Sequence, residues 1–186
     1  MKRLIIAVLT SCILLSLGTA AHAKTGDESA PDITTLSEYE IDGSLAFASG
    51  PGGYDGGVGL NFGAGYALRT IDPNLQARFD ISLYTFNTNF TWGTGLYTRT
   101  PIIVSARYYM PVGGRLRAYG QAGFETSIDG FDTADHQRKN EVNFGIAPGA
   151  GVEFFFTPTT SVFGLAIVHL ISDSYVSMQI GVAGYF

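Results

Sequence analysis

The chain has 186 residues, a formal net charge of −5 and 46% apolar residues. A net acidic protein attracts polyanions poorly, so we exclude nucleic acid as a partner. The content of Gly (24 residues) and of aromatic residues (13%) departs from that of a soluble helical domain and favours an all-β protein.

Residues 1–23 are predicted to be a Sec signal peptide. Lys2 and Arg3 give a basic start, residues 4–17 are mostly apolar, and Ala21-His-Ala23 is a small-x-small cleavage site. The apolar run is too short for a membrane helix. Leu9-Thr-Ser-Cys12 also loosely matches a lipoprotein box, but apolar residues continue past the cysteine. Because Cys12 is the only cysteine, the mature chain would hold no disulfide and no cysteine metal site.

Residues 24–38 are polar and acidic, and we expect them to form a loose periplasmic N-terminal lead. Residues 39–186 then show eight segments in which apolar residues alternate with polar or small ones. This period of two predicts strands, and their length suits tilted strands that cross a bilayer. The segments are Tyr39–Ser49, Gly57–Arg69, Leu75–Asn87, Leu96–Met110, Leu116–Ile128, Val142–Phe155, Ser161–Ile171 and Tyr175–Phe186.

The connections alternate in length. Three tight turns are predicted at Ile71–Asn74, Pro111–Gly114 and Thr157–Thr160, where Pro, Gly or Asn take the favoured positions. Longer Gly- and Asp-rich stretches lie at 50–56, 88–95 and 129–141, followed by the brief 172–174. An even number of strands with short turns on one side predicts an eight-stranded antiparallel transmembrane β-barrel with both termini in the periplasm.

Charged side chains fall on the face of the strands opposite the apolar one, which would be the barrel interior. Eight strands enclose a lumen about wide enough for side chains, and an unpaired buried charge costs several kcal/mol. We therefore predict an Arg–carboxylate network that plugs the lumen, with Tyr84, Tyr119 and Gln121 bonded into it. A selective ion path or gate is the alternative. The predicted interior charges are Glu40, Asp42, Arg69, Arg78, Asp80, Arg99, Arg107, Arg117, Glu125 and Glu153.

Outward-facing aromatic residues gather at the predicted periplasmic ends of the strands, where rings tolerate a half-wet interface. A soluble barrel of the lipocalin kind would explain part of the alternation, but not the signal peptide and this girdle together. The girdle residues are Tyr39, Tyr66, Tyr108, Phe154 and Phe186.

The last strand, Tyr175–Phe186, ends on an aromatic residue, and in this the chain resembles the small OmpA- and OmpX-like outer-membrane barrels. The resemblance implies that Phe186 belongs to an assembly signal read by the barrel assembly machinery. It also implies contact with outer-membrane lipid and lipopolysaccharide. Barrels of this group are mostly anchors, adhesins or envelope stabilisers, so we expect a non-enzymatic role in envelope integrity or surface interaction, without a cofactor. A narrow passive pore is the alternative.

His169 would point toward lipid if the bulkier parity of the seventh segment faces outward. An outward His at the outer leaflet is similar to that of the outer-membrane lipid A deacylases, which carry His-x-Ser-Asn. Here the run is His169-Leu-Ile-Ser172-Asp173, with the serine one residue late, so a deacylase is the weaker alternative.

Two of the longer loops are candidate surfaces for a ligand. Loop 129–141 holds several acids without EF-hand spacing, and its Arg138 and Lys139 suit lipopolysaccharide phosphates. The segment around loop 88–95 is expected to expose Phe90, Trp92 and Tyr97, either as ligand anchors or as an upper aromatic girdle. The sequence contains no metal-ligand cluster and no nucleotide motif.

Overall fold

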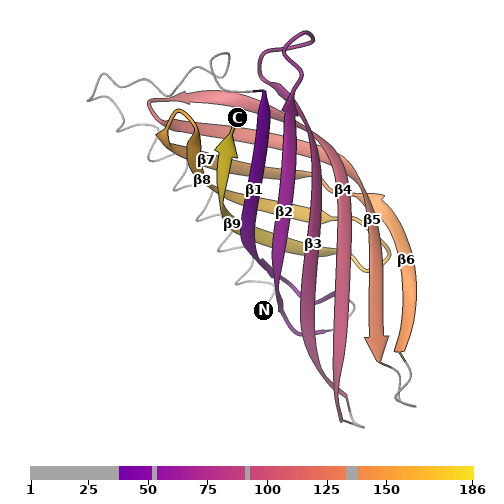
Figure 1. Ribbon diagram of the computed structural model, residues 1–186. Helices are drawn as coiled ribbons and strands as arrows, with labels where there is room; N and C mark the ends of the chain where they lie inside the picture. Colours follow the sequence, from indigo (N-terminus) through magenta and orange to yellow (C-terminus); the bar gives the residue numbers. More distant parts are fainter. Residues whose placement is uncertain (1–37, 52–53, 91–92, 133–137) are drawn as a thin grey trace.

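The computed structural model describes residues 38–51, 54–90, 93–132 and 138–186. The expected signal peptide and almost all of the N-terminal lead lie outside the described residues. The described chain forms nine strands (Figure 1): β1 (Tyr39–Ala48), β2 (Gly57–Ala67), β3 (Leu75–Phe90), β4 (Gly93–Gly113), β5 (Leu116–Asp132), β6 (Arg138–Ile146), β7 (Gly149–Thr157), β8 (Thr160–His169) and β9 (Tyr175–Tyr185). Within these ranges no helix is long and apolar enough to span a membrane.

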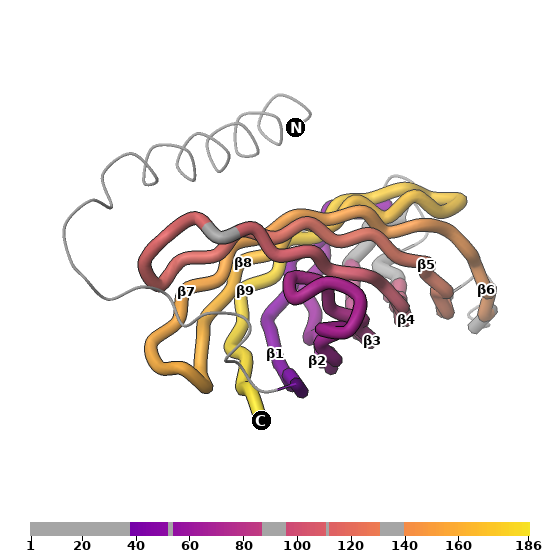
Figure 2. The backbone as a smooth tube through the Cα atoms, turned by 90° about the horizontal axis from the view of Figure 1, so that it is seen from above, coloured from indigo at the N-terminus to yellow at the C-terminus, as the bar shows by residue number. Residues whose placement is uncertain are grey.

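The strands form one closed antiparallel sheet. β1 pairs with β2 on one edge and with β9 on the other, and β4 pairs with β5, so the sheet returns to its start. Figure 2 shows the last strand, β9, beside the first. β6 and β7 both pair with β5, β6 along Phe124–Asp132 and β7 along Leu116–Gln121, and therefore fill one position in the barrel. The prediction of an eight-stranded barrel is confirmed.

The break between β6 and β7 falls at Ala147-Pro148, because proline has no N–H to donate to a ladder. The neighbouring strands bridge the break: the Ala147 N–H donates to the Gly123 carbonyl, and the Val168 N–H donates to the Pro148 carbonyl, both at 2.9 Å. The predicted sixth segment is thus two strands with the same inside and outside parity.

The barrel has two unlike ends. The short-turn end carries the turns β2–β3, β4–β5 and β7–β8 with both Tyr39 and Phe186, whose backbones are joined by hydrogen bonds of 3.3 and 2.9 Å. The opposite, loop end carries the β3–β4 and β5–β6 hairpins, which extend well past the other strands (Figure 1). All five predicted girdle residues are exposed, and the rings of Tyr39 and Tyr66 lie 5.3 Å apart.

The predicted loops at 88–95 and 129–141 are shorter than expected. β3 and β4 pair as far as Phe90↔Gly93, and β5 and β6 pair as far as Asp132↔Arg138. Apolar alternation stops earlier than the strands do, since the backbone ladder needs no apolar face once the strands leave the barrel wall. Sequence periodicity therefore placed these strand ends too early.

Inward and outward faces agree with the sequence on every strand except β8. There Phe163, Leu165, Ile167 and His169 are buried inside the barrel, whereas Val162, Gly164, Ala166 and Val168 form the outer face. The condition under which His169 would point toward lipid is therefore not met. Glycines on the adjacent strands explain the reversal, because a Cβ at Gly149 would press on Ile167 (3.3 Å) and one at Gly181 on Phe163 (2.7 Å). The space for the bulky residues is inside.

The β4–β5 turn depends on Gly113 and Gly114, whose φ angles are +117° and +62°. This left-handed region is unfavourable for residues with a Cβ. We expect Gly114→Ala to lower the free energy of unfolding by about 1 kcal/mol in a urea titration in lipid vesicles. Gly120→Ala is the matched control, since a Cβ meets nothing within 4 Å at either position. Equal effects of the two changes would contradict this account of the turn.

Candidate functional site in the barrel lumen

Nearly all the predicted interior charges are buried in the lumen. Arg69 is half-buried, at the short-turn end. The buried ones are Glu40, Asp42, Arg78, Asp80, Arg99, Arg107, Arg117, Glu125 and Glu153. Side-chain contacts divide most of them into two groups along the barrel.

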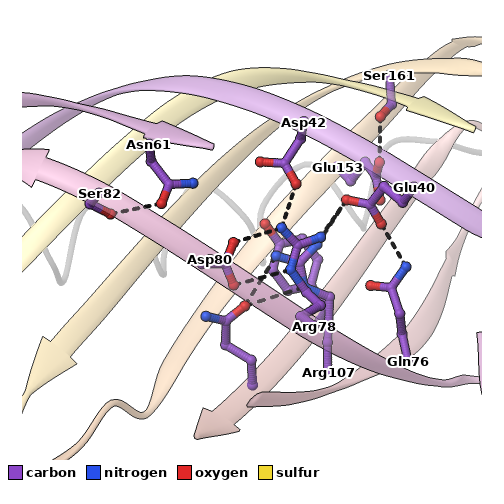
Figure 3. Close-up of polar contacts among 12 residues, drawn as sticks. Glu40, Asp42, Asn61, Gln76, Arg78, Asp80, Ser82, Arg107, Glu153 and Ser161 are labelled. Carbon is purple, nitrogen blue, oxygen red and sulfur yellow. Dashed lines mark hydrogen bonds and ion pairs between the residues drawn. The ribbon is translucent and has the colours of Figure 1, made fainter. Parts of the chain in front are cut away.

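The first group centres on Arg78 of β3, on which three carboxylates converge (Figure 3). Nη1 donates to Oε1 of Glu40 at 2.5 Å, and Nη2 donates to Oδ1 of Asp80 at 2.8 Å and also to Asp42. Glu40 and Asp42 lie on β1, which is separated from β3 by β2. These bonds therefore join strands that are not ladder neighbours.

Glu40 links this group to β4. Its carboxylate accepts hydrogen bonds from Gln76 Nε2 (2.7 Å) and from the Tyr109 hydroxyl (3.2 Å), and Arg107 Nη1 lies 3.5 Å from Oε1. Arg107 also donates to Gln121 Oε1 at 3.1 Å. We call this group the short-turn layer: Glu40, Asp42, Gln76, Arg78, Asp80, Arg107, Tyr109 and Gln121.

Tyr119 and Tyr84 meet the prediction only in part. The guanidinium of Arg107 lies 4.0 Å over the Tyr119 ring, an arrangement that favours a cation. The Tyr84 hydroxyl makes no hydrogen bond with the described residues. Tyr84 instead packs by its ring against Phe86 and Tyr175.

Two further interior charges lie beside the short-turn layer. Glu153 of β7 accepts hydrogen bonds from Ser161 and from the Tyr185 hydroxyl (2.5 Å). Arg117 of β5 lies 4.7 Å over the ring of Phe155. Arg117 and Glu153 are ladder partners, and an apolar cluster that includes Phe155, Phe163 and Tyr185 fills the lumen beside them.

The second group centres on Arg99 of β4, near the loop end. Its Nε and Nη2 donate to the two oxygens of Asp129 at 2.8 and 2.6 Å, a bidentate pair. Asp129 also accepts from Ser127 (2.6 Å) and from the hydroxyl of Tyr97 (2.9 Å). Tyr97 is buried, so the prediction that it is exposed on the surface is wrong. Phe90 and Trp92 fall where no side chain is described.

His169 belongs to this second group. Its Nδ1 lies 2.7 Å from Glu125 Oε2, its Nε2 lies 2.8 Å from Ser177 Oγ, and its ring stacks on Tyr175 at 4.0 Å. Arg99 covers Tyr175 at 4.9 Å. We call this group the loop layer: Tyr97, Arg99, Glu125, Ser127, Asp129, His169, Tyr175 and Ser177.

Sequence reasoning missed Ser177 as the partner of His169. It considered Ser172, whose hydroxyl donates instead to Asn143 Oδ1 at 2.9 Å. Only the β8–β9 register, in which Ile167 pairs with Ser177 and His169 with Tyr175, brings the correct serine to the imidazole. No local sequence signal carries that register.

A serine, a histidine and a carboxylate in this order also form the nucleophile, base and orienting group of many hydrolases. Here Ser177 and His169 are 0% exposed and Glu125 is 1% exposed, so no substrate contacts them in this conformation. The chain of contacts instead joins β5, β8 and β9 across the lumen. Within the described residues no group of three or more His, Cys, Asp or Glu side chains is placed to hold a metal ion.

Above the loop layer, Tyr54 from the β1–β2 connection stacks on Tyr97 with 4.6 Å between ring centroids. Burial, together with the nearby Asp173 carboxylate, raises the pKa of the Tyr54 hydroxyl. Tyr54 also packs against an apolar cluster of Ala46, Ala48, Tyr84, Phe86, Tyr97, Ile171 and Tyr175. The loop end of the lumen is therefore filled by rings as well as by charges.

Comparison with known proteins places this geometry in a family. The model of the outer membrane protein β-barrel domain matches residues 10–184. Neisserial surface protein A has a similar structure, with 16% identity over 81% of this chain and 99% of that chain and a TM-score of 0.68. Comparison with curated protein sequences finds no match.

Two other solved structures are also similar. OprG from Pseudomonas aeruginosa has 13% identity over 81% of this chain and 97% of that chain, with a TM-score of 0.60. Ail from Yersinia pestis, in complex with the heparin analogue sucrose octasulfate, has 16% identity over 81% and 99%, with a TM-score of 0.57. At these identities the likeness concerns the fold alone.

Glu40→Ala tests the short-turn layer. The change leaves the buried Arg78 and Arg107 without the carboxylate they share, and breaking a buried pair is costly. We expect the free energy of unfolding in lipid vesicles to fall by about 3–5 kcal/mol. Glu141→Ala removes an exposed acid of β6 and should change it by less than about 0.5 kcal/mol. A similar small effect at Glu40 would contradict the assigned pairing.

A double-mutant cycle tests the His169–Glu125 contact. We expect His169→Ala and Glu125→Ala to be non-additive by about 1 kcal/mol or more, because each change removes the same interaction. As the matched cycle, Glu125→Ala is combined with Tyr185→Phe at the short-turn end, where additivity within about 0.5 kcal/mol is expected. Additivity in both cycles would show that the contact contributes nothing to stability.

Proposed function

The chain belongs to the outer membrane protein β-barrel domain family, and from this premise we propose that it is a closed, non-enzymatic barrel that stabilises the cell outer membrane and presents its loop end at the surface. The short-turn end would face the periplasm together with both termini. Short turns on the periplasmic side and longer loops outside are usual for such barrels. Phe186 would act as part of the assembly signal.

The filled lumen is the observation that carries this proposal. Large side chains of every interior layer are buried, among them Arg99, Arg107, Tyr84, Tyr119 and Phe155. The guanidinium groups of Arg99, Arg107 and Arg117 are engaged in ion pairs, hydrogen bonds or ring contacts. Such an interior supports a structural role over the alternative of a passive pore, because no ion crosses a packed core without moving it.

The enzymatic alternative loses its main support. A lipid A deacylase of the expected kind needs an outward histidine, and His169 lies in the lumen with Ser177 and Glu125. What remains for interaction is the loop end, where β3–β4 and β5–β6 extend outward. We propose that these hairpins, with segments 88–95 and 129–141, meet lipopolysaccharide or a surface ligand.

Planar bilayer recording tests the closed barrel. We expect the purified, folded protein to give no single-channel steps at about ±100 mV in roughly 1 M KCl, conditions in which a general porin inserted in the same way conducts. Folding is verified by heat-modifiable migration on a gel. Reproducible ohmic steps from folded protein would overturn the proposal and favour the pore.

A further inference from the structure

We propose that the lumen is sealed twice, once by the short-turn layer and once by the loop layer, and that a belt of small polar residues between them holds ordered water. This inference rests on the closed barrel proposed above and adds the position and number of its seals. The belt consists of Ser44 on β1, Asn61 on β2 and Ser82 on β3, with Ser105 on β4 and Gly123 on β5.

The inward-facing residues of single strands show the division. On β1 the order is Glu40 and Asp42, then Ser44, then Ala46 and Ala48. The two acids bind Arg78, whereas the two alanines belong to the aromatic cluster at the loop end. Ser44 lies between the two groups and belongs to neither.

β3 and β5 repeat this order. On β3, Asp80 of the short-turn layer is followed by Ser82 and then by Tyr84 of the loop-end cluster. On β5, Gln121 of the short-turn layer is followed by Gly123 and then by Glu125 of the loop layer. Small residues thus separate the two layers on strands from both sides of the barrel.

The two layers are also separate in their contacts. Among the described residues, no hydrogen bond or ion pair joins a member of one layer to a member of the other. The buried apolar side chains form two clusters as well, and these share no residue. Two separate sets of packed side chains therefore lie in the lumen.

Hydrogen-bonding capacity is left over in the belt, as it is at other lumen side chains such as Gln76, Gln121 and Tyr175. Ser44, Asn61 and Ser82 are cross-strand neighbours, and Ser82 Oγ donates to Asn61 Oδ1 at 2.7 Å. Ser44 Oγ, Asn61 Nδ2 and Ser105 Oγ are buried without a partner in the described structure. So are Asp42 Oδ1 and Glu125 Oε1, the carboxylate oxygens of the two bordering layers.

Backbone pairing is also interrupted beside Ser82 of the belt. The β3–β4 ladder passes from Ile81↔Ile102 to Tyr84↔Arg99, so Thr100 and Pro101 have no partners on β3. Buried polar atoms without protein partners are the usual sites of ordered water. Water is small enough for a belt of Ser, Asn and Gly and can both donate to and accept from these groups.

A single cysteine in the belt tests the proposal, because residues 24–186 contain no cysteine. The parent for the test is Ser44→Cys. Arg78→Ala with Arg107→Ala opens the short-turn layer, and Arg99→Ala with Tyr175→Ala opens the loop layer. Each pair is made alone and both are combined. The rate of labelling by a small charged methanethiosulfonate and the bilayer conductance are measured for each folded protein.

The labelling rate and the conductance should respond differently to opening a single layer. In each protein with one layer opened, we expect labelling of the thiol in the belt to rise at least about tenfold over the parent while conductance stays at zero, because the seal on the other side still blocks the lumen. In the combined protein we expect channels. Leu45→Cys is the control, because Leu45 points outward on the same strand. Its thiol should be labelled at the same rate whether neither layer, one layer or both layers are opened.

Other outcomes overturn distinct claims. Rapid labelling of the Ser44→Cys parent, or conductance of the wild-type chain, would refute the proposal that the lumen is blocked. Conductance after one layer is opened would leave the barrel closed but sealed once. No labelling in either single-layer protein, or no channel in the combined one, would show that the barriers lie elsewhere.

If the alanine variants do not fold, a measurement on the wild-type protein still tests whether the belt holds ordered water. The side-chain amide of Asn61 should show a magnetic resonance cross-peak to long-lived water. The Asn143 side-chain amide, which donates to Asp129 while its Oδ1 accepts from Ser172, is the control without such a cross-peak. Absence of the Asn61 cross-peak would refute the belt.

Discussion

The pairing of Arg78 with three carboxylates is the constraint on which the short-turn half of the barrel depends. Desolvating a guanidinium and its partners is offset only when the ion pairs and hydrogen bonds have good geometry. That geometry needs β1 and β3 in one register, so that Asp42 and Asp80 both reach Arg78. β2 lies between these strands and carries Gly63 at this point, where a Cβ would collide with all three side chains. The absence of a side chain at Gly63 thus permits the contacts that hold β1, the strand whose pairing with β9 closes the barrel.

Space, rather than polarity, decides which way β8 faces. Both faces of this strand are apolar, so alternation of hydropathy cannot orient it. The interior beside β8 is bounded by Gly149 and Gly151 on β7 and by Gly181 on β9. The bulkier face fills that volume, and its last residue, His169, is carried inside. A rule that larger apolar residues face lipid fails in a narrow barrel, because the lumen also has to be filled.

These two cases separate what the sequence predicts from what it leaves open. Tyr39, Ile41, Leu45 and Phe47 alternate with Glu40 and Asp42, so their strand, its faces and its place in a barrel follow from a period of two. The partner of a buried charge follows from a register between strands distant in the chain. Glu125 meets His169 across 44 positions, and a shift of β9 by two residues would replace Ser177 with another side chain. Charge and parity predicted an interior network, but they could not divide it into two layers.

In the function proposed above, a filled lumen would leave the loop end as the place where this barrel meets a ligand. Interior side chains are constrained by one another, since each guanidinium needs its carboxylate and each ring needs its space. The hairpins at the loop end have no such constraint, because their ladders satisfy the backbone without an apolar core. Changes there can alter the chemistry of the loop end without disturbing Arg78 or His169. In the function proposed above, the interior would set the stability of the barrel and the hairpins at the loop end would set what it binds.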